Sequence, residues 1–387
     1  MIESRSKAHE ESDFKHRRLA RSGRSGGRST AHRAEAAFSE CAGHACVDRQ
    51  LHAIGVDLFF VISAFLLTNN LLRHTGERRL TLRFYLRRAL RILPLYWILL
   101  FSGFMMQDWW LANGGSRDFW LWRNHLPLVD YLLLIQNWRT AAPFAYFYLP
   151  TWSLAAEEQF YLLLPLALAG LSHRIFAWLA GAMIIFSPMI RMVLLKQVSP
   201  SASYFWTLAH LDAFSWGILL ALEQRFPGDL KPQVSRRFCI LATISLIFLA
   251  LMLAPGGSGS PLGLSLSSLA SALAVLGALR PGQEPMTEPG RLAQGLAWCG
   301  RRCYSIYLFH YPVMGSVYLA AGGWDARDRA HGSALLVAIS ILATFILAAF
   351  TFRFVEQPLI KLADRIAPYA RAPGTALAGE SAARPSA

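Results

Sequence analysis

The chain has 387 residues, of which 54% are hydrophobic and 16% charged, whereas an ordinary soluble protein carries about 25% charged residues. Its net charge of +14 would suit a nucleic-acid partner, but the arginines gather between apolar runs and no nucleic-acid-binding motif is present. The composition excludes a typical soluble enzyme or nucleic-acid-binding protein and indicates a membrane protein.

Apolar stretches of about twenty residues recur along the chain, each long enough to cross a hydrocarbon core of about 30 Å as a helix. The sequence therefore predicts an all-α polytopic membrane protein with about nine to ten transmembrane helices. The predicted spans are residues 54–72, 92–111, 149–171, 175–195, 204–222, 238–254, 262–279, 298–320 and 333–354.

The arginines also predict how the chain is oriented. Seven of them lie between residues 73 and 91, with Glu77 as the only acid, and short loops rich in Arg and Lys stay on the cytoplasmic side. If each predicted span crosses the membrane once, the basic loops at 225–237 and 280–302 lie on the same side as this loop. Loops at 254–263 and 324–329, which carry no net charge, fall on the opposite side.

Residues 1–50 do not fit this pattern, because they would lie outside the cell although they hold ten Arg and Lys residues and no apolar run. Either they form a disordered external arm, or the natural first helix is missing or misread; we favour the second explanation. We expect a transmembrane domain over residues 51–365 and a disordered cytoplasmic tail over residues 366–387.

Asp57 is the first ionisable residue that we expect inside the membrane. It stands in GVDLFFVISAFLL, residues 55–67, near the outer end of the first predicted span. Charged groups inside a bilayer are costly, so each is a candidate functional residue. An ion pair or hydrogen bond to a neighbouring helix explains Asp57 as well as a catalytic role does.

Arg88 and Arg91 stand three residues apart in FYLRRALRILPLYW, residues 84–97. This spacing places both on one helix face, where two guanidinium groups can converge on a phosphate-bearing ligand. The alternative is that these arginines only set the topology of the membrane helices.

The stretch PTWSLAAEEQFYLLLPL, residues 150–166, brings Ser153, Glu157 and Glu158 to the start of an apolar helix. Ser153 is a suitable N-cap, and acidic residues in a first turn interact favourably with the helix dipole, which is a sufficient structural reason for them. Glu157 also lies four residues before Tyr161, a spacing that orients a carboxylate toward a hydroxyl. We therefore expect a functional role for Glu157 more than for Glu158.

Three further polar residues fall within predicted spans. His210 and Asp212 are two residues apart and point to different helix faces, so they make a poor catalytic dyad and either bind sugar or face a polar seam. His310 lies near the middle of residues 298–320, where it either packs with a hydrogen bond or takes part in function. Cys41, His44 and Cys46 lack an ordered scaffold, so we expect no metal site.

Six motifs stand in the order found in the acyltransferase-3 family of membrane O-acyltransferases, the O-antigen acetylase type. The resemblance covers about residues 54–361, and six motifs in order are more specific than any one of them. They are GVDLFFVISAFLL, FYLRRALRILPLYW, TWSLAAEEQFYLLLPL, HLDAFSWGILLA, YSIYLFHYPV and FRFVEQPL.

The resemblance implies transfer of an acyl group, usually acetyl from cytoplasmic acetyl-CoA, to a hydroxyl of an extracytoplasmic glycan such as exopolysaccharide or lipopolysaccharide. It further implies a multi-pass protein of the bacterial inner membrane. Its partners would be acyl-CoA, a glycan or lipid-linked sugar acceptor and membrane lipids, with acetyl-CoA as co-substrate and no nucleic acid.

The matched motifs imply roles for individual residues. Arg88 and Arg91 match the paired arginines of the family and would bind the donor, and Glu157 would position or activate the acceptor. Ser153 belongs to the same motif as Glu157, and Ser153, Asp57 and His310 fall on motif positions that would bind substrate. Glu356 also falls on a motif position of the family.

The first helix departs from the family pattern, in which a catalytic His follows an Arg after ten residues and closes that helix. Arg33 and His44 keep this spacing in RAEAAFSECAGH, but the residues between them are too polar for an ordinary membrane helix. His44 is therefore the candidate catalytic base. The alternatives are a catalytically inactive or truncated relative, or a polytopic glycan transporter, although a transporter does not account for the ordered motifs.

Overall fold

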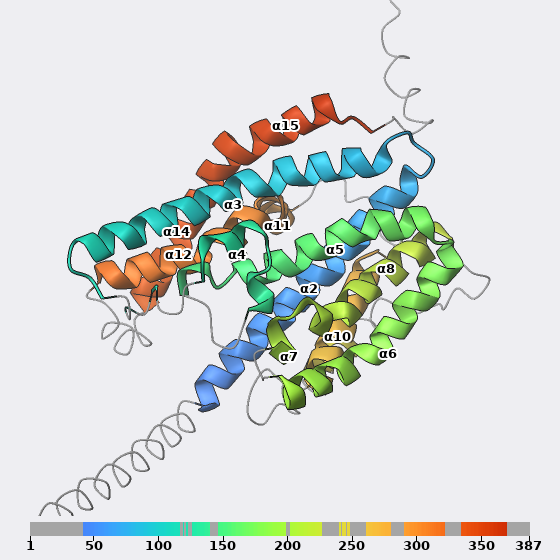
Figure 1. Ribbon diagram of the computed structural model, residues 1–387, viewed down its shortest axis with the longest axis horizontal. Coiled ribbons are helices and arrows are strands. Elements are labelled where there is room, and N and C mark those ends of the chain that lie inside the picture. The colour runs from blue at the N-terminus through green and yellow to red at the C-terminus, as the bar shows by residue number, and fades with distance from the viewer. Residues whose placement is uncertain are drawn as a thin grey trace, which may run out of the picture.

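The computed structural model describes residues 42–116, 119, 121–122, 126–139, 146–198, 202–226, 240, 242–244, 246–247, 261–279, 290–321 and 334–369, with side chains from residue 54 onward. All regular structure in these ranges is helical (Figure 1), which confirms the predicted all-α class for this part of the chain. The long helices are α2 (Ala42–Arg73), α3 (Leu80–Ala112), α5 (Thr151–Gly170), α6 (His173–Gln197), α8 (Leu211–Arg225), α10 (Pro261–Leu279), α11 (Arg291–Arg301), α12 (Cys303–Ala320), α14 (Ala334–Thr351) and α15 (Gln357–Ile366).

Short helical segments connect these helices. Between α3 and α5 lie α4 (Leu128–Leu132) and the 3-10 turns η1 (Gln136–Trp138) and η2 (Tyr146–Tyr148). Between α6 and α8 lie α7 (Ala202–Phe205) and η3 (Thr207–His210). The π-helical turn η4 (Phe352–Glu356) joins α14 to α15 without a break.

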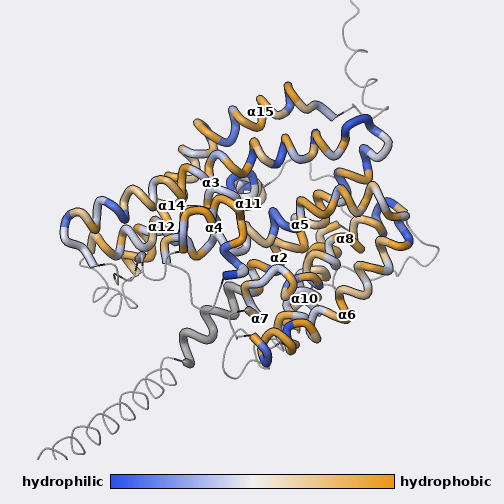
Figure 2. The backbone as a smooth tube through the Cα atoms, viewed as in Figure 1, coloured by the Kyte–Doolittle hydropathy of each residue, from blue (hydrophilic) through white to orange (hydrophobic). Residues whose placement is uncertain are grey.

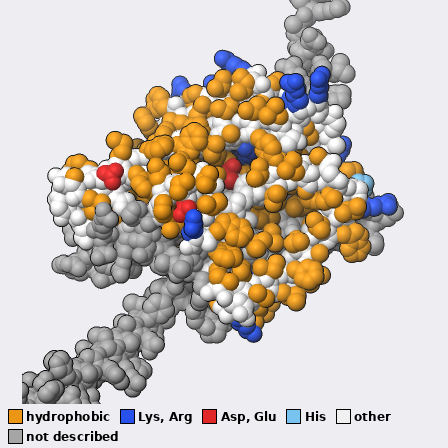
Figure 3. Space-filling view, in the orientation of Figure 1, with side chains coloured by type: hydrophobic (Ala, Val, Ile, Leu, Met, Phe, Trp, Pro, Cys, Tyr) orange, Lys and Arg blue, Asp and Glu red, His pale blue; other side chains and the backbone are white. Residues whose placement is uncertain are grey.

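Within the described ranges, five helices are long and apolar enough to cross a membrane: Ile54–Arg73 in α2, then α3, α6, α10 and the continuous stretch Ala334–Ile366. Their outer surfaces suit lipid, since large side chains such as Met105, Trp178 and Ile185 are exposed. Figure 2 shows apolar colour along the helices and polar residues at turns such as the one between α2 and α3. Figure 3 shows a face covered mainly by hydrophobic side chains, with most basic groups near its edge.

Several helix boundaries differ from the predicted spans. Helix α3 begins at Leu80 and continues through Pro94, so Arg83, Arg88 and Arg91 lie on a helix and not in a long basic loop. The reason is that apolar residues alternate with these arginines, so the helix already has an apolar face in the residues that precede position 92. The remaining turn is short, and Arg79 adopts a left-handed conformation at its end with φ 62°.

Four other spans differ in extent. Helix α2 begins at Ala42, upstream of the predicted residue 54. The span predicted over residues 204–222 is divided among α7, η3 and α8, and the one over 298–320 is broken at Arg302 between α11 and α12. The span over residues 333–354 continues through η4 into α15, while most of residues 238–254 lie outside the described ranges.

Two apolar cores meet at α2. One lies mainly between α3, α5 and α12 and contains Tyr96, Tyr148 and Leu308, and the other lies between α2, α8 and α10. The contact of α2 with α8 is the most extensive between any two helices described here. Gly217 of α8 permits it, because a Cβ atom at this position would collide with the Val61 carbonyl oxygen and lie 2.8 Å from the Phe65 nitrogen.

Helix α15 runs beside α3 (Figure 1) and is fastened to it by polar contacts. Arg87 forms an ion pair of 2.7 Å with Asp364 and donates a hydrogen bond to the Ala367 carbonyl. Just beyond α15, the ring of Tyr369 stacks on His74 with centroids 4.4 Å apart. These contacts, which we call the α15 clasp, hold the first turns of α3 in place.

Candidate active site

Arg88 and Arg91 lie on one face of α3, half-buried between helices. The Arg88 guanidinium sits 5.8 Å from the centre of the Tyr161 ring and 5.9 Å from that of Phe84. Arg91 lies within electrostatic range of Glu356, whose carboxylate accepts a hydrogen bond from Ser305. The two arginines therefore come together inside the bundle, as the i, i+3 spacing predicts.

The pairing of the arginines on α3 is uneven. Arg83 forms an ion pair of 2.9 Å with Glu77, and Arg87 forms the α15 clasp. Among the residues that the structure describes, neither Arg88 nor Arg91 lies within 4 Å of a carboxylate oxygen. Half-buried guanidinium groups without a close counter-ion are suited to an anionic ligand.

Helix α5 begins before Ser153, so the predicted Ser153 cap is wrong. The helix starts at Thr151 after Pro150, so Ser153 is its third residue and its hydroxyl donates back to the Pro150 carbonyl. Proline at a helix start was the signal that should have set the boundary. Glu157 and Glu158 consequently fall in the second turn, beyond the first-turn amides that would have explained them.

Glu157 is buried with 2% of its surface exposed, and it packs beside Ser63 of α2 and Tyr161 of α5. Its Oε1 atom, like that of Glu158, has no hydrogen-bond partner among the described residues. Arg88 lies within electrostatic range of both carboxyl groups. Buried carboxyl oxygens without a partner are rare in proteins and often mark functional positions.

Tyr307 of α12 connects Ser153 to His310. Its hydroxyl lies 2.5 Å from the Ser153 hydroxyl, and its ring stacks on Phe59 of α2. Its carbonyl accepts a hydrogen bond of 2.5 Å from the His310 Nδ1 atom. Nδ1 therefore carries a proton, which makes Nε2 the acceptor atom whenever the imidazole is neutral.

These residues form a continuous row because the helices run in register. Tyr85 of α3 donates to the Leu162 carbonyl in the second half of α5, and Tyr304 of α12 donates to the Ile92 carbonyl of α3. Helices α3 and α12 therefore run antiparallel to α5. The row, which we call the polar column, runs from the arginine end to the histidine end through Arg91, Arg88, Glu158, Glu157, Ser153, Tyr307 and His310.

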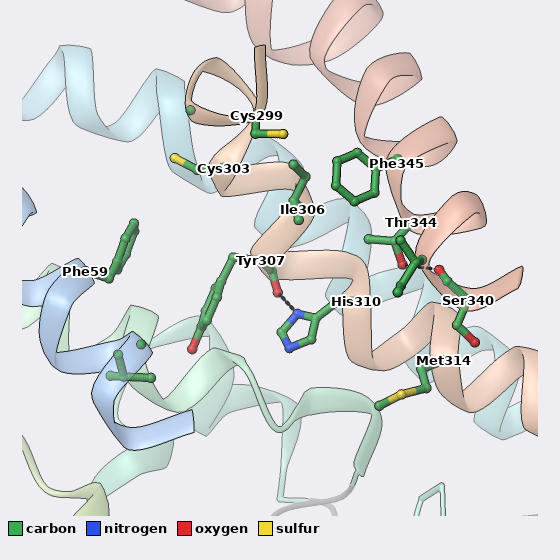
Figure 4. Close-up of a pocket in the computed structure, with 14 residues that line it drawn as sticks. Phe59, Cys299, Cys303, Ile306, Tyr307, His310, Met314, Ser340, Thr344 and Phe345 are labelled. Atoms are coloured by element: carbon green, nitrogen blue, oxygen red, sulfur yellow. Dashed lines mark hydrogen bonds between the residues drawn. The ribbon is translucent and has the colours of Figure 1, made fainter. Parts of the chain in front are cut away.

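A cavity of about 660 Å³ lies beside the histidine end of the polar column. Figure 4 shows Tyr307 and His310 on its α12 wall, with Phe59 of α2 on one side and Thr344 of α14 on the other. A cavity of this size is typical of small-molecule sites. The polar column and the cavity together make the candidate active site.

Comparison with known proteins identifies the family. A family model described as an acyltransferase domain matches residues 29–353. The chain belongs to the acyltransferase-3 family. The match begins upstream of the motifs that suggested it, so residues 29–53 are part of the family domain.

Curated relatives of this acyltransferase-3 chain are named as O-acetyltransferases. It is 27% identical to peptidoglycan O-acetyltransferase OatA of Listeria monocytogenes over 80% of this chain and 51% of that protein. It is 27% identical to the putative peptidoglycan O-acetyltransferase YrhL of Bacillus subtilis over 79% of this chain and 50% of that protein. For O-acetyltransferase OatA of Staphylococcus aureus the identity is 26%, over 80% and 52%.

The chain thus spans about half the length of the curated relatives it matches. No solved structure matches it at a significant level.

Asp57 of this family member does not join the polar column. Its Oδ1 atom lies 3.1 Å from Nδ1 of His210, and both side chains are 1% exposed. The Nε2 atom of His210 donates to the Tyr204 carbonyl at 2.6 Å. This is the structural pairing that the sequence left open for Asp57, and its substrate-binding role stays a prediction.

His210 and Asp212 do not form a dyad, as their spacing predicted. Asp212 instead receives two hydrogen bonds from the buried Arg191 guanidinium, at 3.1 and 2.7 Å. Arg191 also donates to the Ala209 and Pro261 carbonyls and to Ser265. Arg191 was not among the predicted site residues, although an arginine inside an apolar span was a sufficient signal.

His44 lies in the first turn of α2, and its side chain is not among those that the structure describes. Arg33 and Cys41 lie outside the described residues. Both Arg33 and His44 fall inside the family match. The catalytic role of His44 and the absence of a metal site remain predictions.

Proposed function

We propose that this chain is an integral membrane O-acyltransferase that moves an acetyl group from acetyl-CoA to a hydroxyl of an extracytoplasmic glycan. Family membership supports acyl transfer, and the printed names of the relatives favour acetyl and a cell-wall glycan. Exopolysaccharide and lipopolysaccharide are acceptors of the same hydroxyl chemistry. We place the protein as a multi-pass protein of the bacterial inner membrane.

The donor would bind at the arginine end of the polar column. Acetyl-CoA carries several phosphates, and guanidinium pairs bind phosphate oxygens in a bidentate manner. Arg88 and Arg91 are suited to this role because they lack a close counter-ion, whereas Arg83 and Arg87 are already paired. This difference between neighbouring arginines is the observation that carries the proposal.

The acceptor would approach from the histidine end. In the transfer, the acceptor oxygen forms a bond to the acetyl carbon, the carbon–sulfur bond of the thioester breaks, and the hydroxyl proton passes by way of a base to the leaving thiolate. His44 is the candidate base. Glu157 is placed to orient the acceptor hydroxyl, because its Oε1 atom lacks a partner among the described residues.

The direction of transfer follows from the positive charge near the arginine end of the polar column. The turn between α2 and α3 is strongly basic, so we place the arginine end at the cytoplasmic face, where acetyl-CoA is available. The histidine end then faces outward. Donor and acceptor would meet within the bundle along the polar column.

The proposal is tested with the full chain in proteoliposomes, labelled acetyl-CoA and extracted surface glycans. We expect label transfer that falls about 10- to 100-fold in Arg88→Ala, the loss typical of a hydrogen bond to a charged group. Glu157→Gln should lower transfer by about 10²-fold or more if it orients the reacting hydroxyl. Arg83→Ala is the matched control, because this arginine is on the same helix but paired with Glu77.

Three outcomes would overturn the proposal. Absence of transfer by the intact chain with every glycan fraction would indicate the catalytically inactive relative. Equal losses of label transfer in Arg88→Ala and Arg83→Ala would indicate that these arginines only set the topology of the membrane helices. Movement of unmodified glycan across the vesicle membrane without label transfer would favour the transporter.

A further inference from the structure

Arg302 is a half-buried cation that is not part of the polar column. It stands at the break between α11 and α12, and it lies outside the six motifs that suggested the family. The central carbon of its guanidinium lies 4.0 Å from the centre of the Trp298 ring and 4.7 Å from that of Phe352. Two aromatic rings thus hold this planar cation in place, which reduces the conformational entropy lost when a ligand binds to it.

The start of α12 packs against α3 close to Arg91. The Tyr304 hydroxyl donates a hydrogen bond of 2.8 Å to the carbonyl of Ile92, the residue that follows Arg91. Glu356 of η4 lies within electrostatic range of both Arg91 and Arg302. The two arginines therefore approach one carboxylate from separate parts of the chain.

Glu356 does not neutralise both arginines. Its side chain is buried and accepts a hydrogen bond from Ser305, which in turn accepts one from Thr351. Among the residues that the structure describes, no carboxylate oxygen lies within 4 Å of a nitrogen of Arg91 or Arg302. Two guanidinium groups beside one carboxylate leave a positive charge in excess, which an anionic ligand would complement.

Arg302 also has hydrogen-bond donors left for such a ligand. One terminal nitrogen donates to the Trp298 carbonyl at 3.2 Å, and the other forms no hydrogen bond with a described residue. The buried Nε atom likewise has no partner within the described ranges. A guanidinium group carries five N–H donors, and their fixed geometry suits the oxygens of a phosphate.

We infer that Arg302 is a third donor-binding residue, which contacts a phosphate of acyl-CoA together with Arg91. The inference rests on the proposed acyl transfer, because it assigns Arg302 to the donor of that reaction. A phosphate contact is remote from the thioester carbon that reacts. Loss of the contact should therefore weaken donor binding and leave the chemical step nearly unchanged.

Donor binding is measured with tritiated coenzyme A and the full chain in phosphatidylcholine nanodiscs. We expect Arg302→Gln to raise the Kd about 10- to 100-fold, the loss typical of a hydrogen bond to a charged group. Arg302→Lys should lose part of the affinity, because an ammonium keeps the charge but not the planar contact with the two rings. Arg301→Gln is the matched control, since it removes the same charge from the exposed neighbouring residue and should leave the Kd unchanged.

A kinetic ratio separates phosphate binding from damage to the fold. Acetyl-CoA and acetylpantetheine share the thioester, but only acetyl-CoA carries phosphates. We expect Arg302→Gln to lower the ratio of kcat/KM for acetyl-CoA to that for acetylpantetheine about tenfold or more, mainly through a higher KM for acetyl-CoA. An unfolded fraction cancels from this ratio, because both donors are measured on one preparation. An equal loss with both donors would show that Arg302 only supports the fold, and would overturn the inference.

Failure of this inference is distinguishable from failure of the proposed function. Weaker binding of coenzyme A by Arg302→Gln, without acetyl transfer by the native chain, would overturn the proposed function alone. Acetyl transfer by the native chain with an unchanged Kd in Arg302→Gln would overturn the role of Arg302 alone. Equal increases of the Kd in Arg302→Gln and Arg301→Gln would also overturn that role, since only net charge would then matter.

An anionic lipid headgroup is the other source of a phosphate at this position. Binding of coenzyme A is therefore repeated in nanodiscs that contain phosphatidylglycerol. If Arg302 binds the donor, the increase of the Kd in Arg302→Gln persists in both lipid compositions. Competition of phosphatidylglycerol with coenzyme A in the native chain but not in Arg302→Gln would assign the site to the lipid and overturn the inference.

Discussion

Individual buried charges in the described part of this protein divide into those with a counter-ion within 4 Å and those without one. Arg191 and Asp212 satisfy each other fully, and Arg191 also holds the Ala209 carbonyl next to His210. Arg88, Arg91 and the two adjacent glutamates of α5 lack such close pairing within the described residues. The contacts of the first group explain it structurally, whereas the second group belongs to the candidate active site.

Replacing one member of the Arg191–Asp212 pair should be strongly destabilising. Asp212→Asn leaves the buried guanidinium without its counter-ion, which typically costs about 3–5 kcal/mol. We expect a large fall in the thermal unfolding midpoint of the detergent-solubilised protein. The double variant Arg191→Met/Asp212→Leu should recover much of the loss, and a double variant no more stable than Asp212→Asn would contradict this account.

At this scale the sequence predicts spacing within one helix well and contacts between helices poorly. The common face of Arg88 and Arg91 follows from a spacing of three residues. The contact of Ser153 with Tyr307 joins residues 154 positions apart, and the pairing of Asp57 with His210 spans 153. Such pairs depend on the register in which helices pack, which one sequence does not specify.

At the level of the helices, close packing of α8 on α2 depends on one missing side chain. Gly217→Ala would place a methyl group against the Val61 carbonyl and 2.7 Å from the Ala64 Cβ, so the helices must separate. Overpacking of this kind typically costs about 1–3 kcal/mol. Thermal unfolding in detergent should show the loss.

Gly181→Ala is the control for this prediction, since its added Cβ meets no atom within 4 Å. Here the higher helix propensity of alanine should stabilise the protein by up to about 1 kcal/mol. A similar change in both variants would show that α8 and α2 are not in close contact.

The sequence predicted where helices occur better than it predicted the residues at which they begin and end. The apolar stretches located the long helices, because burial or lipid contact requires continuous apolar surface. The breaks at Arg302 and between η3 and α8 were not predicted, although polar residues interrupt the apolar run at both places: Arg301 and Arg302 at the first, His210 and Asp212 at the second. The π turn at η4 was not predicted either, and in the structure Glu356 at its end accepts a hydrogen bond from Ser305.

For the whole molecule, the main prediction is that the two ends of α3 lie on opposite sides of the membrane. The helix has 33 residues and is about 50 Å long, more than a bilayer core requires. In a chain with its five native cysteines replaced by alanine, Thr75→Cys should react with an impermeant thiol reagent only after the cells are permeabilised. Asn113→Cys should react in intact cells.

Both positions are exposed, so neither result depends on burial of the thiol. Reaction of Thr75→Cys in intact cells would reverse the predicted orientation and place the arginine end away from cytoplasmic acetyl-CoA. Arg83→Cys is unsuitable for this measurement because the native side chain is paired with Glu77.

The α15 clasp has a consequence for biosynthesis. Asp364 and Tyr369 lie at the end of the last membrane helix described here, yet they fix Arg87 and His74 near the beginning of the domain. The residue next to Arg88 is thus anchored only when translation is almost complete. A nascent chain that stops before residue 357 would insert its helices but leave the start of α3 unsecured, so the proposed binding of a donor at Arg88 would become possible only late in assembly.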